Sequence, residues 1–168
     1  MNRRALLLAG TGLLVAPRAF AQGDETAYLL DLEAAQVALY ARARELPLKG
    51  RAAALAGRFH THEVAHLARL RDLLGGPEPA TPAFKFGNEK DFLRLAQRLE
   101  GLAVSAYNGA IPAVKDPAVR GELASIAQTE GRHAAAIRDL RGKPPAPRPY
   151  DPGAPADRVQ RALTALSG

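Results

Sequence analysis

A repeat with an offset of 67 residues constrains the fold of this chain more than any other feature. Glu63-Val-Ala-His66 returns at that offset as Glu130-Gly-Arg-His133. The same offset relates two further pairs, Glu33 with Glu100 and Tyr40 with Tyr107. Because one register without gaps relates all of these residues, the pattern predicts a duplicated two-helix unit.

Composition favours helices for that unit. The 168 residues are rich in Ala, Leu and Arg, aromatic residues make up 5% and Cys is absent. Ala, Leu and Arg are good helix formers, whereas strands favour β-branched and aromatic residues. The absence of Cys excludes disulfides, thiolate metal sites and Cys nucleophiles. We therefore expect one all-α domain with a hydrophobic core.

Apolar spacing and helix-end signals predict four long helices. We expect Asp24 or Thr26 to cap the first helix and Asn88 to cap the third. Asp116 should cap the fourth, because Pro117 suits the first helical position. The expected helices span about 26–45, 51–74, 89–112 and 117–141.

The segment between the second and third helices sets the expected topology. Residues 75–88 hold three Pro, three Gly and two Phe, and Phe84 and Phe86 favour burial. At about 3.3 Å per residue this segment reaches roughly 46 Å, whereas a helix of about 24 residues is roughly 36 Å long. The third helix therefore need not run antiparallel to the second. We expect a four-helix bundle of two hairpins joined by a long crossover.

The C-terminal segment has a different composition. Residues 143–155 contain six Pro, which predicts an extended tail. Residues 156–166 could form a short helix with Val159, Leu163 and Leu166 on one side. The pattern leaves open whether this helix packs on its own bundle or on a partner.

The N-terminus has the pattern of a cleaved signal peptide. Arg3-Arg4 precedes an apolar run that is short for a membrane span, and Ala19-Phe20-Ala21 is a small-x-small cleavage site. A membrane anchor is the alternative, and the arginine pair fits either twin-arginine or ordinary export. We expect a signal peptide over 1–21, a bundle over 22–142 and a tail over 143–168. The mature protein would be periplasmic or extracellular, with no membrane segment.

Charge does not indicate a nucleic-acid partner. The formal net charge of +6 includes three Arg of residues 1–21, so the rest of the chain carries +3. Lys and Arg are scattered among Asp and Glu, without a basic stripe interleaved with aromatic residues. A solvated surface of mixed charge is the better interpretation.

Six ionisable side chains fall on the inner faces of the expected helices. If the hairpins are antiparallel, the four Glu of the repeat share one level of the bundle. A lone carboxylate on an apolar stripe is costly unless it is protonated, paired or bound to metal. A His three residues after its Glu reaches the same face. We therefore expect two divalent metal ions held by Glu33, Glu63, His66, Glu100, Glu130 and His133. A polar core without metal is the alternative.

The donor set bears on the metal. Many carboxylate oxygens with two imidazoles favour Fe, with Mn as the next choice, over Zn or Cu. Tyr40 and Tyr107 lie two helical turns from Glu33 and Glu100, so they should lie beside the metals. They could donate hydrogen bonds to the ligands, donate electrons, or be plain core aromatics.

The two Glu-x-x-His motifs and the matched Glu residues resemble the ferritin-like superfamily. Leu74-Gly-Gly-Pro77 and the ending Tyr150-Asp151 extend the resemblance to bacterial exported ferritin-like domain proteins, which include desiccation-related proteins. The resemblance implies the same six metal ligands. It also implies that His62 and Thr129, each just before a motif Glu, orient the opposite His.

Gln36 stands where close relatives often have another Glu, so the resemblance implies the loss of an acidic residue on the route to the metals. Bulk iron storage is therefore not expected. Two functions remain. One is a di-iron or di-manganese oxidoreductase that oxidises Fe(II) or consumes peroxide, with dioxygen or peroxide as its partner. The other is a non-catalytic stress- or desiccation-related protein with a structural or sequestering metal. A homo-oligomer is left open.

Overall fold

The computed structural model describes residues 26–167, which contain helices and no strand. The predicted signal peptide over 1–21 and the candidate cap Asp24 lie outside these residues. The helices are α1 (Tyr28–Ala43), α2 (Gly50–Leu74), α3 (Glu89–Ala110), α4 (Pro117–Leu140) and α5 (Ala156–Ser167), and a short 3-10 turn, η1 (Ile111–Ala113), follows α3. The all-α prediction is confirmed. Within 26–167, no helix combines the length and hydrophobicity needed to cross a membrane.

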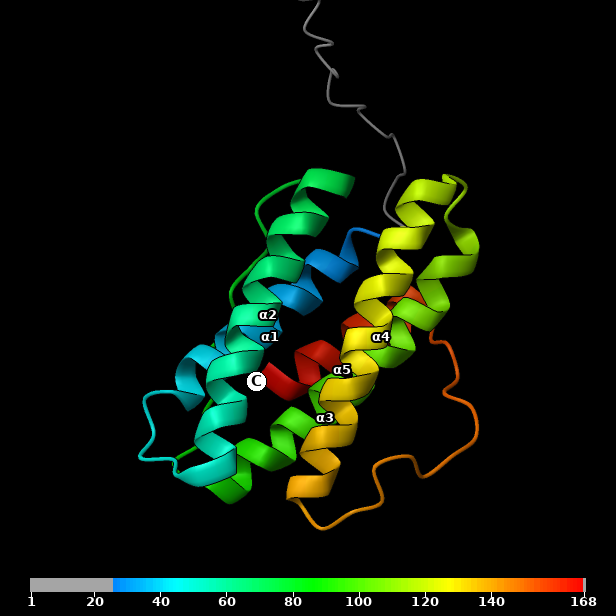
Figure 1. Cartoon of the computed structure of the whole chain (residues 1–168). Coiled ribbons are helices and arrows are strands. Elements are labelled where there is room, and N and C mark those ends of the chain that lie inside the picture. The colour runs from blue at the N-terminus through cyan, green and yellow to red at the C-terminus, as the bar shows by residue number, and fades with distance from the viewer. Residues whose placement is uncertain (1–25, 168) are drawn as a thin grey trace, which may run out of the picture.

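The bundle consists of two hairpins. α1 packs along α2 and α3 packs along α4, and the hairpins meet through α1 with α3 and α2 with α4. The connector 75–88 runs back along the bundle, so α2 and α3 point in the same direction (Figure 1). This is the long crossover that the connector length predicts. As a result, α1 and α3 run antiparallel, and so do α2 and α4.

Two of the predicted helix caps are confirmed. The Asn88 side chain accepts a hydrogen bond from the backbone N–H of Asp91 at 2.9 Å. The Asp116 side chain accepts one from the N–H of Ala118 at 2.7 Å, with Pro117 at the first helical position. Both side chains satisfy N–H groups that have no partner within the helix.

The Thr26 cap is wrong. α1 starts after Ala27, whose own backbone is already helical, and no side chain caps it. The backbone carbonyls of Thr26 and Ala27 accept from Leu29 and Leu30 instead, at 3.0 Å each. A turn therefore leads into α1, and it replaces the side-chain cap.

The connector contributes to the core, as its two Phe residues predict. Phe84 and Phe86 are each 7% exposed. The centroid of the Phe86 ring lies 5.8 Å from that of Phe92 in α3. The guanidinium of Arg42 in α1 lies over the Phe86 ring, 5.7 Å from its centroid. The crossover is thus held to both hairpins by aromatic and cation–π contacts.

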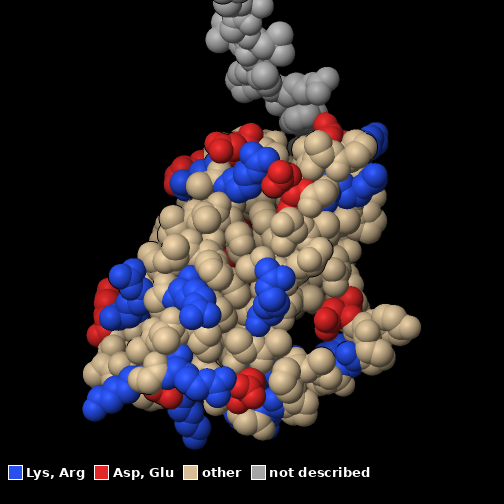
Figure 2. All heavy atoms as spheres, in the orientation of Figure 1, with Lys and Arg blue, Asp and Glu red and all other residues tan. Residues whose placement is uncertain are grey.

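The C-terminal helix packs on its own bundle. α5 contacts α3 and α1, and Val159 and Leu166 are buried. The Pro-rich residues 143–155, here called the strap, are fixed near their end by the Ala154 N–H, which donates to the Ser105 carbonyl at 2.8 Å. Asn108 Nδ2 donates to the Asp151 carbonyl at 2.9 Å. Figure 2 shows a hollow between the strap and the helices, with charges of both signs over this face.

Candidate metal centre

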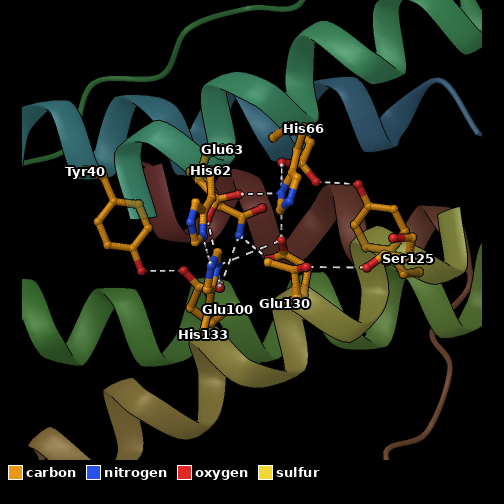
Figure 3. A network of polar contacts seen from close by, with 12 residues as sticks. Tyr40, His62, Glu63, His66, Glu100, Ser125, Glu130 and His133 are labelled. Carbon is orange, nitrogen blue, oxygen red and sulfur yellow. Dashed lines mark hydrogen bonds and ion pairs between the residues drawn. The ribbon is translucent and has the colours of Figure 1, made fainter. Parts of the chain in front are cut away.

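The fold brings all six predicted metal ligands into one layer of the bundle. Each of the four helices supplies one Glu, and α2 and α4 each add a His one turn later. The four Glu side chains are fully buried. The His133 side chain is 2% exposed and the His66 side chain 12% exposed. Figure 3 shows Glu63, His66, Glu100, Glu130 and His133 pointing toward one another.

These residues form two overlapping groups. Ligand atoms within 4.8 Å of one another come from Glu33, Glu63, His66 and Glu130 in one group, and from Glu63, Glu100, Glu130 and His133 in the other. Glu63 and Glu130 belong to both. Either group could hold a metal ion, because it offers three carboxylates and one imidazole nitrogen.

The layer contains more hydrogen-bond acceptors than donors. His66 Nδ1 lies 3.0 Å from both Glu63 Oε2 and Glu130 Oε1, and 3.5 Å from Glu33 Oε2. His133 Nδ1 lies 2.8 Å from Glu63 Oε1, but the two atoms are not aligned for a hydrogen bond. One N–H serves one acceptor well, so several oxygens remain without a donor.

The unpaired atoms fit a bound cation. The buried atoms without a hydrogen-bond partner in residues 26–167 are Glu33 Oε2, Gln36 Oε1, Glu63 Oε1, Glu130 Oε1 and His133 Nδ1. Four of these five belong to predicted ligands. A buried polar atom without a partner is costly, and one cation in each of the two groups would remove that cost for all four.

The electrostatics of the metal-free layer agree with this fit. Burial, followed by the charge of Glu130, raises the pKa of Glu33 to about 8 and that of Glu63 to about 7. Burial also raises the pKa of Glu100 well above its ordinary value. Burial opposes the ionisation of Glu130 too, but the close contact with His66 and the charge of His133 outweigh burial and lower the pKa of Glu130. Without a cation, the layer therefore favours protons on several carboxyl groups.

His66 responds in the opposite way. Burial alone would lower its pKa, but the close approach of its Nδ1 to the carboxylates of Glu130, Glu33 and Glu63 outweighs burial and raises the pKa to about 12. In the metal-free protein the imidazolium of His66 is thus the positive charge that balances the carboxylates. A metal ion would replace that proton.

The family model described as ferritin-like domain matches residues 23–143. The chain belongs to the ferritin-like domain family. The match spans α1 to α4 and ends where the strap begins. A comparison with curated proteins gives no match.

Two tyrosines of this ferritin-like chain bond across the hairpins. The Tyr40 hydroxyl of α1 donates to Glu100 Oε1 of α3, and the Tyr107 hydroxyl of α3 donates to Glu33 Oε1 of α1. Burial, followed by the charge of the bonded Glu, raises the pKa of both tyrosines well above its ordinary value. Both hydroxyls therefore keep their protons and act as hydrogen-bond donors to the layer.

His62 and Thr129 occupy equivalent positions in the repeat but make different contacts. His62 Nδ1 lies 2.9 Å from His133 Nε2, so His62 meets the opposite His. The Thr129 hydroxyl is instead within 3.4 Å of the Ser125 carbonyl and accepts from Arg132 at 2.8 Å. His62 thus lies beside a histidine of the layer (Figure 3), whereas the hydrogen bonds of Thr129 go to Ser125 and Arg132.

Gln36 is a residue whose role the sequence reasoning missed. It is fully buried, and its Nε2 donates to Glu130 Oε2 at 2.7 Å and to Glu100 Oε2 at 3.3 Å. Gln36 therefore lies in the layer itself, where it bonds to two of the predicted ligands. Its place on the inner face of the first helix, one turn after Glu33, was the available signal.

Proposed function

We propose that this ferritin-like chain binds a dinuclear centre of iron or manganese through the six residues of the layer. The observation that carries the proposal is that both four-residue groups contain Glu63 and Glu130. A carboxylate has two oxygens, so a shared carboxylate can bind one ion with each. Four Glu side chains also match the charge of two divalent ions.

The proposed activity is oxidation of Fe(II) or consumption of peroxide. When bound, a pair of Fe(II) ions supplies the two electrons that convert one peroxide and two protons into two waters, or one dioxygen and two protons into one peroxide. The residues of the layer would hold the ions in a largely buried site, with His66 its most exposed side chain. Loading with metal displaces the protons that Glu33, Glu63 and His66 hold, so binding becomes stronger as the pH rises.

The proposed location is outside the cytoplasm, with the exported and desiccation-related ferritin-like proteins as the proposed subgroup. The signal-peptide pattern of residues 1–21 supports this location, and the family match begins at residue 23. Mass spectrometry of the protein isolated from the cell envelope should find a mature N-terminus at Gln22. A chain that retains Arg3-Arg4 in the mature protein would contradict export with cleavage.

Metal content tests the centre directly. Elemental analysis of protein purified from its native compartment should give two iron or manganese ions per chain. A Glu63→Gln/Glu130→Gln variant should bind neither ion tightly, because each group loses two of its four ligands. The matched control is Asp72→Asn/Asp139→Asn, which removes the same charge from exposed, repeat-related positions of α2 and α4. Two ions retained by the Gln variant would rule out the proposed ligand set.

A second candidate function follows from the burial of the layer. All four Glu side chains are fully buried, which also suits a metal that is structural or sequestered. Stopped-flow measurements of Fe(II) oxidation and peroxide consumption by the loaded protein separate the two candidates. Turnover in the wild type, lost in the Gln variant, supports the oxidoreductase. Two bound ions without turnover would support the structural or sequestering role instead.

A further inference from the structure

The twofold relation between the halves holds for the predicted ligands and fails for their neighbours. The 67-residue offset relates the Glu, His and Tyr residues of the layer in pairs. At the same offset, His62 corresponds to Thr129, Gln36 to Ala103 and Phe59 to Ile126. The residues that surround the layer are therefore not equivalent on its two sides.

Two of these neighbours, His62 and Phe59, contact the His133 side chain. His62 Nδ1 lies 2.9 Å from His133 Nε2, and the Phe59 ring stacks on the His133 ring with centroids 3.8 Å apart. Hydrogen bonding at one ring nitrogen fixes the tautomer and the direction of the other. His133 Nδ1 is thereby held toward the carboxylates.

His66 lacks an equivalent partner. The hydrogen bonds of residues 26–167 include none at its Nε2. Thr129, at the position equivalent to His62, contacts Ser125 and Arg132 instead. Its side chain is also 12% exposed, compared with 2% for His133. The His66 side of the layer is therefore less restrained and closer to solvent.

Gln36 adds to the same asymmetry. Its amide donates to Glu130, which both groups share, and to Glu100, which belongs to the His133 group alone. Ala103, at the equivalent position, has no polar side chain to offer Glu33. The His133 group thus has its histidine and two of its three carboxylates oriented by His62 and Gln36.

We infer that the two metal positions are unequal: the position with His133 binds the first ion tightly, and the position with His66 binds the second ion weakly and exchanges it with solvent. This inference rests on the proposed dinuclear centre. His62 and Gln36 are its positioning residues. They act through His133, Glu100 and Glu130 rather than by touching the ion.

Titration of the metal-free mature chain with Co(II), followed by calorimetry and visible absorption, tests this inequality. The wild type should bind two ions in two steps with dissociation constants at least about tenfold apart. His133→Ala should abolish the tight step and His66→Ala the weak one. His62→Ala should weaken the tight step about 10–100-fold and leave the weak step unchanged. His62 is partly exposed, and circular dichroism should confirm that the variant keeps its helices.

The repeat supplies the reciprocal variant. Thr129→His should give His66 a partner of the kind that His133 has, so the weak step should strengthen and the two steps should approach each other. Two equal steps in the wild type, or a His62→Ala effect confined to the weak step, would overturn the inequality while leaving the dinuclear centre intact. Binding of fewer than two ions by the wild type would overturn both.

Discussion

Each tyrosine beside the layer donates a hydrogen bond to a Glu of the other hairpin. Tyr40 and Tyr107 donate to Glu100 and Glu33, so the two hydroxyls connect α1 and α3 twice at the level of the site. Because both hydroxyls are fully buried, neither has water as an alternative partner. We expect these bonds to stabilise the folded chain as well as to orient the carboxyl groups.

Tyr40→Phe and Tyr107→Phe test this dual role. Each variant should lower the free energy of unfolding of the metal-free protein by about 1–3 kcal/mol, because a buried carboxyl oxygen loses its donor. Urea unfolding measures the change, and the two values should be similar because the positions are repeat-related. The number of bound metal ions should stay at two. A variant as stable as the wild type would show that the hydroxyl contributes nothing to the fold.

The raised pKa values predict an unusual pH dependence for the metal-free protein. Folded Glu33 and Glu63 have pKa values of about 8 and about 7 against an ordinary 4.5, so the folded state holds protons that the unfolded chain has released. His66, raised to about 12 from 6.5, acts in the same direction above pH 6.5. These contributions are complete at low pH and are lost as the pH rises.

The free energy of unfolding in the presence of a chelator should therefore fall between pH 5 and pH 8. Urea unfolding at several pH values gives the slope, and a Glu33→Gln variant, which cannot titrate at that position, should show a smaller one. A stability that rises over this range in chelator would contradict the protonation of these carboxyl groups.

At the scale of elements, the strap that leads into α5 meets α3 at two glycines, Gly109 of α3 and Gly153 of the strap. A Cβ at Gly109 would overlap the Ala154 backbone, and one at Gly153 would lie 3.0 Å from the Gly109 Cα and the Asn108 carbonyl. The backbones of α3 and the strap therefore touch at this point. The docking of α5 depends on the absence of a side chain there.

Two glycines of α3 should respond to the same substitution with opposite signs. Gly109→Ala should destabilise the protein by about 1–3 kcal/mol through overpacking against the strap. Gly101→Ala, where a Cβ meets nothing within 4 Å, should stabilise it by about 0.5–1 kcal/mol through helix propensity. Thermal unfolding compares the two. Equal effects would mean that the strap does not pack on α3 in solution.

The repeat predicted the helices and the layer well, because both depend on spacing along the chain. Asn88 and Asp116 were correct as caps because a capping side chain acts within three residues of its own position. The start of α1 was wrong, since Ala27 enters the helix through a backbone turn that has no residue signature. Features that depend on residues close together in the sequence, such as helix periodicity and capping side chains, were therefore the ones predicted correctly.

The contacts around the layer depend on how the two hairpins pack against each other. The spacing of residues along the chain does not predict this packing. The tyrosines were expected beside the metals. That each tyrosine bonds to a Glu of the other hairpin depends on the antiparallel pairing of α1 and α3. The inward position of Gln36 was visible, but its two acceptors lie on α3 and α4. The packing of α5 was open for the same reason, because Val159 and Leu166 form an apolar side that several surfaces could cover.

At the scale of the whole molecule, the two hairpins meet as the subunits of a symmetric dimer would. The contact of Tyr40 with Glu100 and that of Tyr107 with Glu33 are one contact made twice, which is the property of an isologous interface. The connector 75–88 converts that association into an intramolecular one. It raises the effective concentration of one hairpin beside the other.

A protease site placed between the exposed residues Ala80 and Thr81 tests this description. After cleavage, the halves should remain together on size-exclusion chromatography at micromolar concentration, because the core and the layer are intact. Metal should raise the urea concentration needed to separate them, because its proposed ligands come from both halves. Fragments that separate without denaturant would show that the connector holds the hairpins together.

The covalent joining of the hairpins also has a consequence for the symmetry of the site. In a dimer of identical hairpins every substitution appears on both sides of the axis, so the two sides cannot be tuned separately. In this chain Gln36 and His62 face one side while Ala103 and Thr129 stand at the matching positions. In a single chain with two hairpins, each position can carry a different residue in each half, so the surroundings of the paired carboxylates can differ on the two sides of the layer.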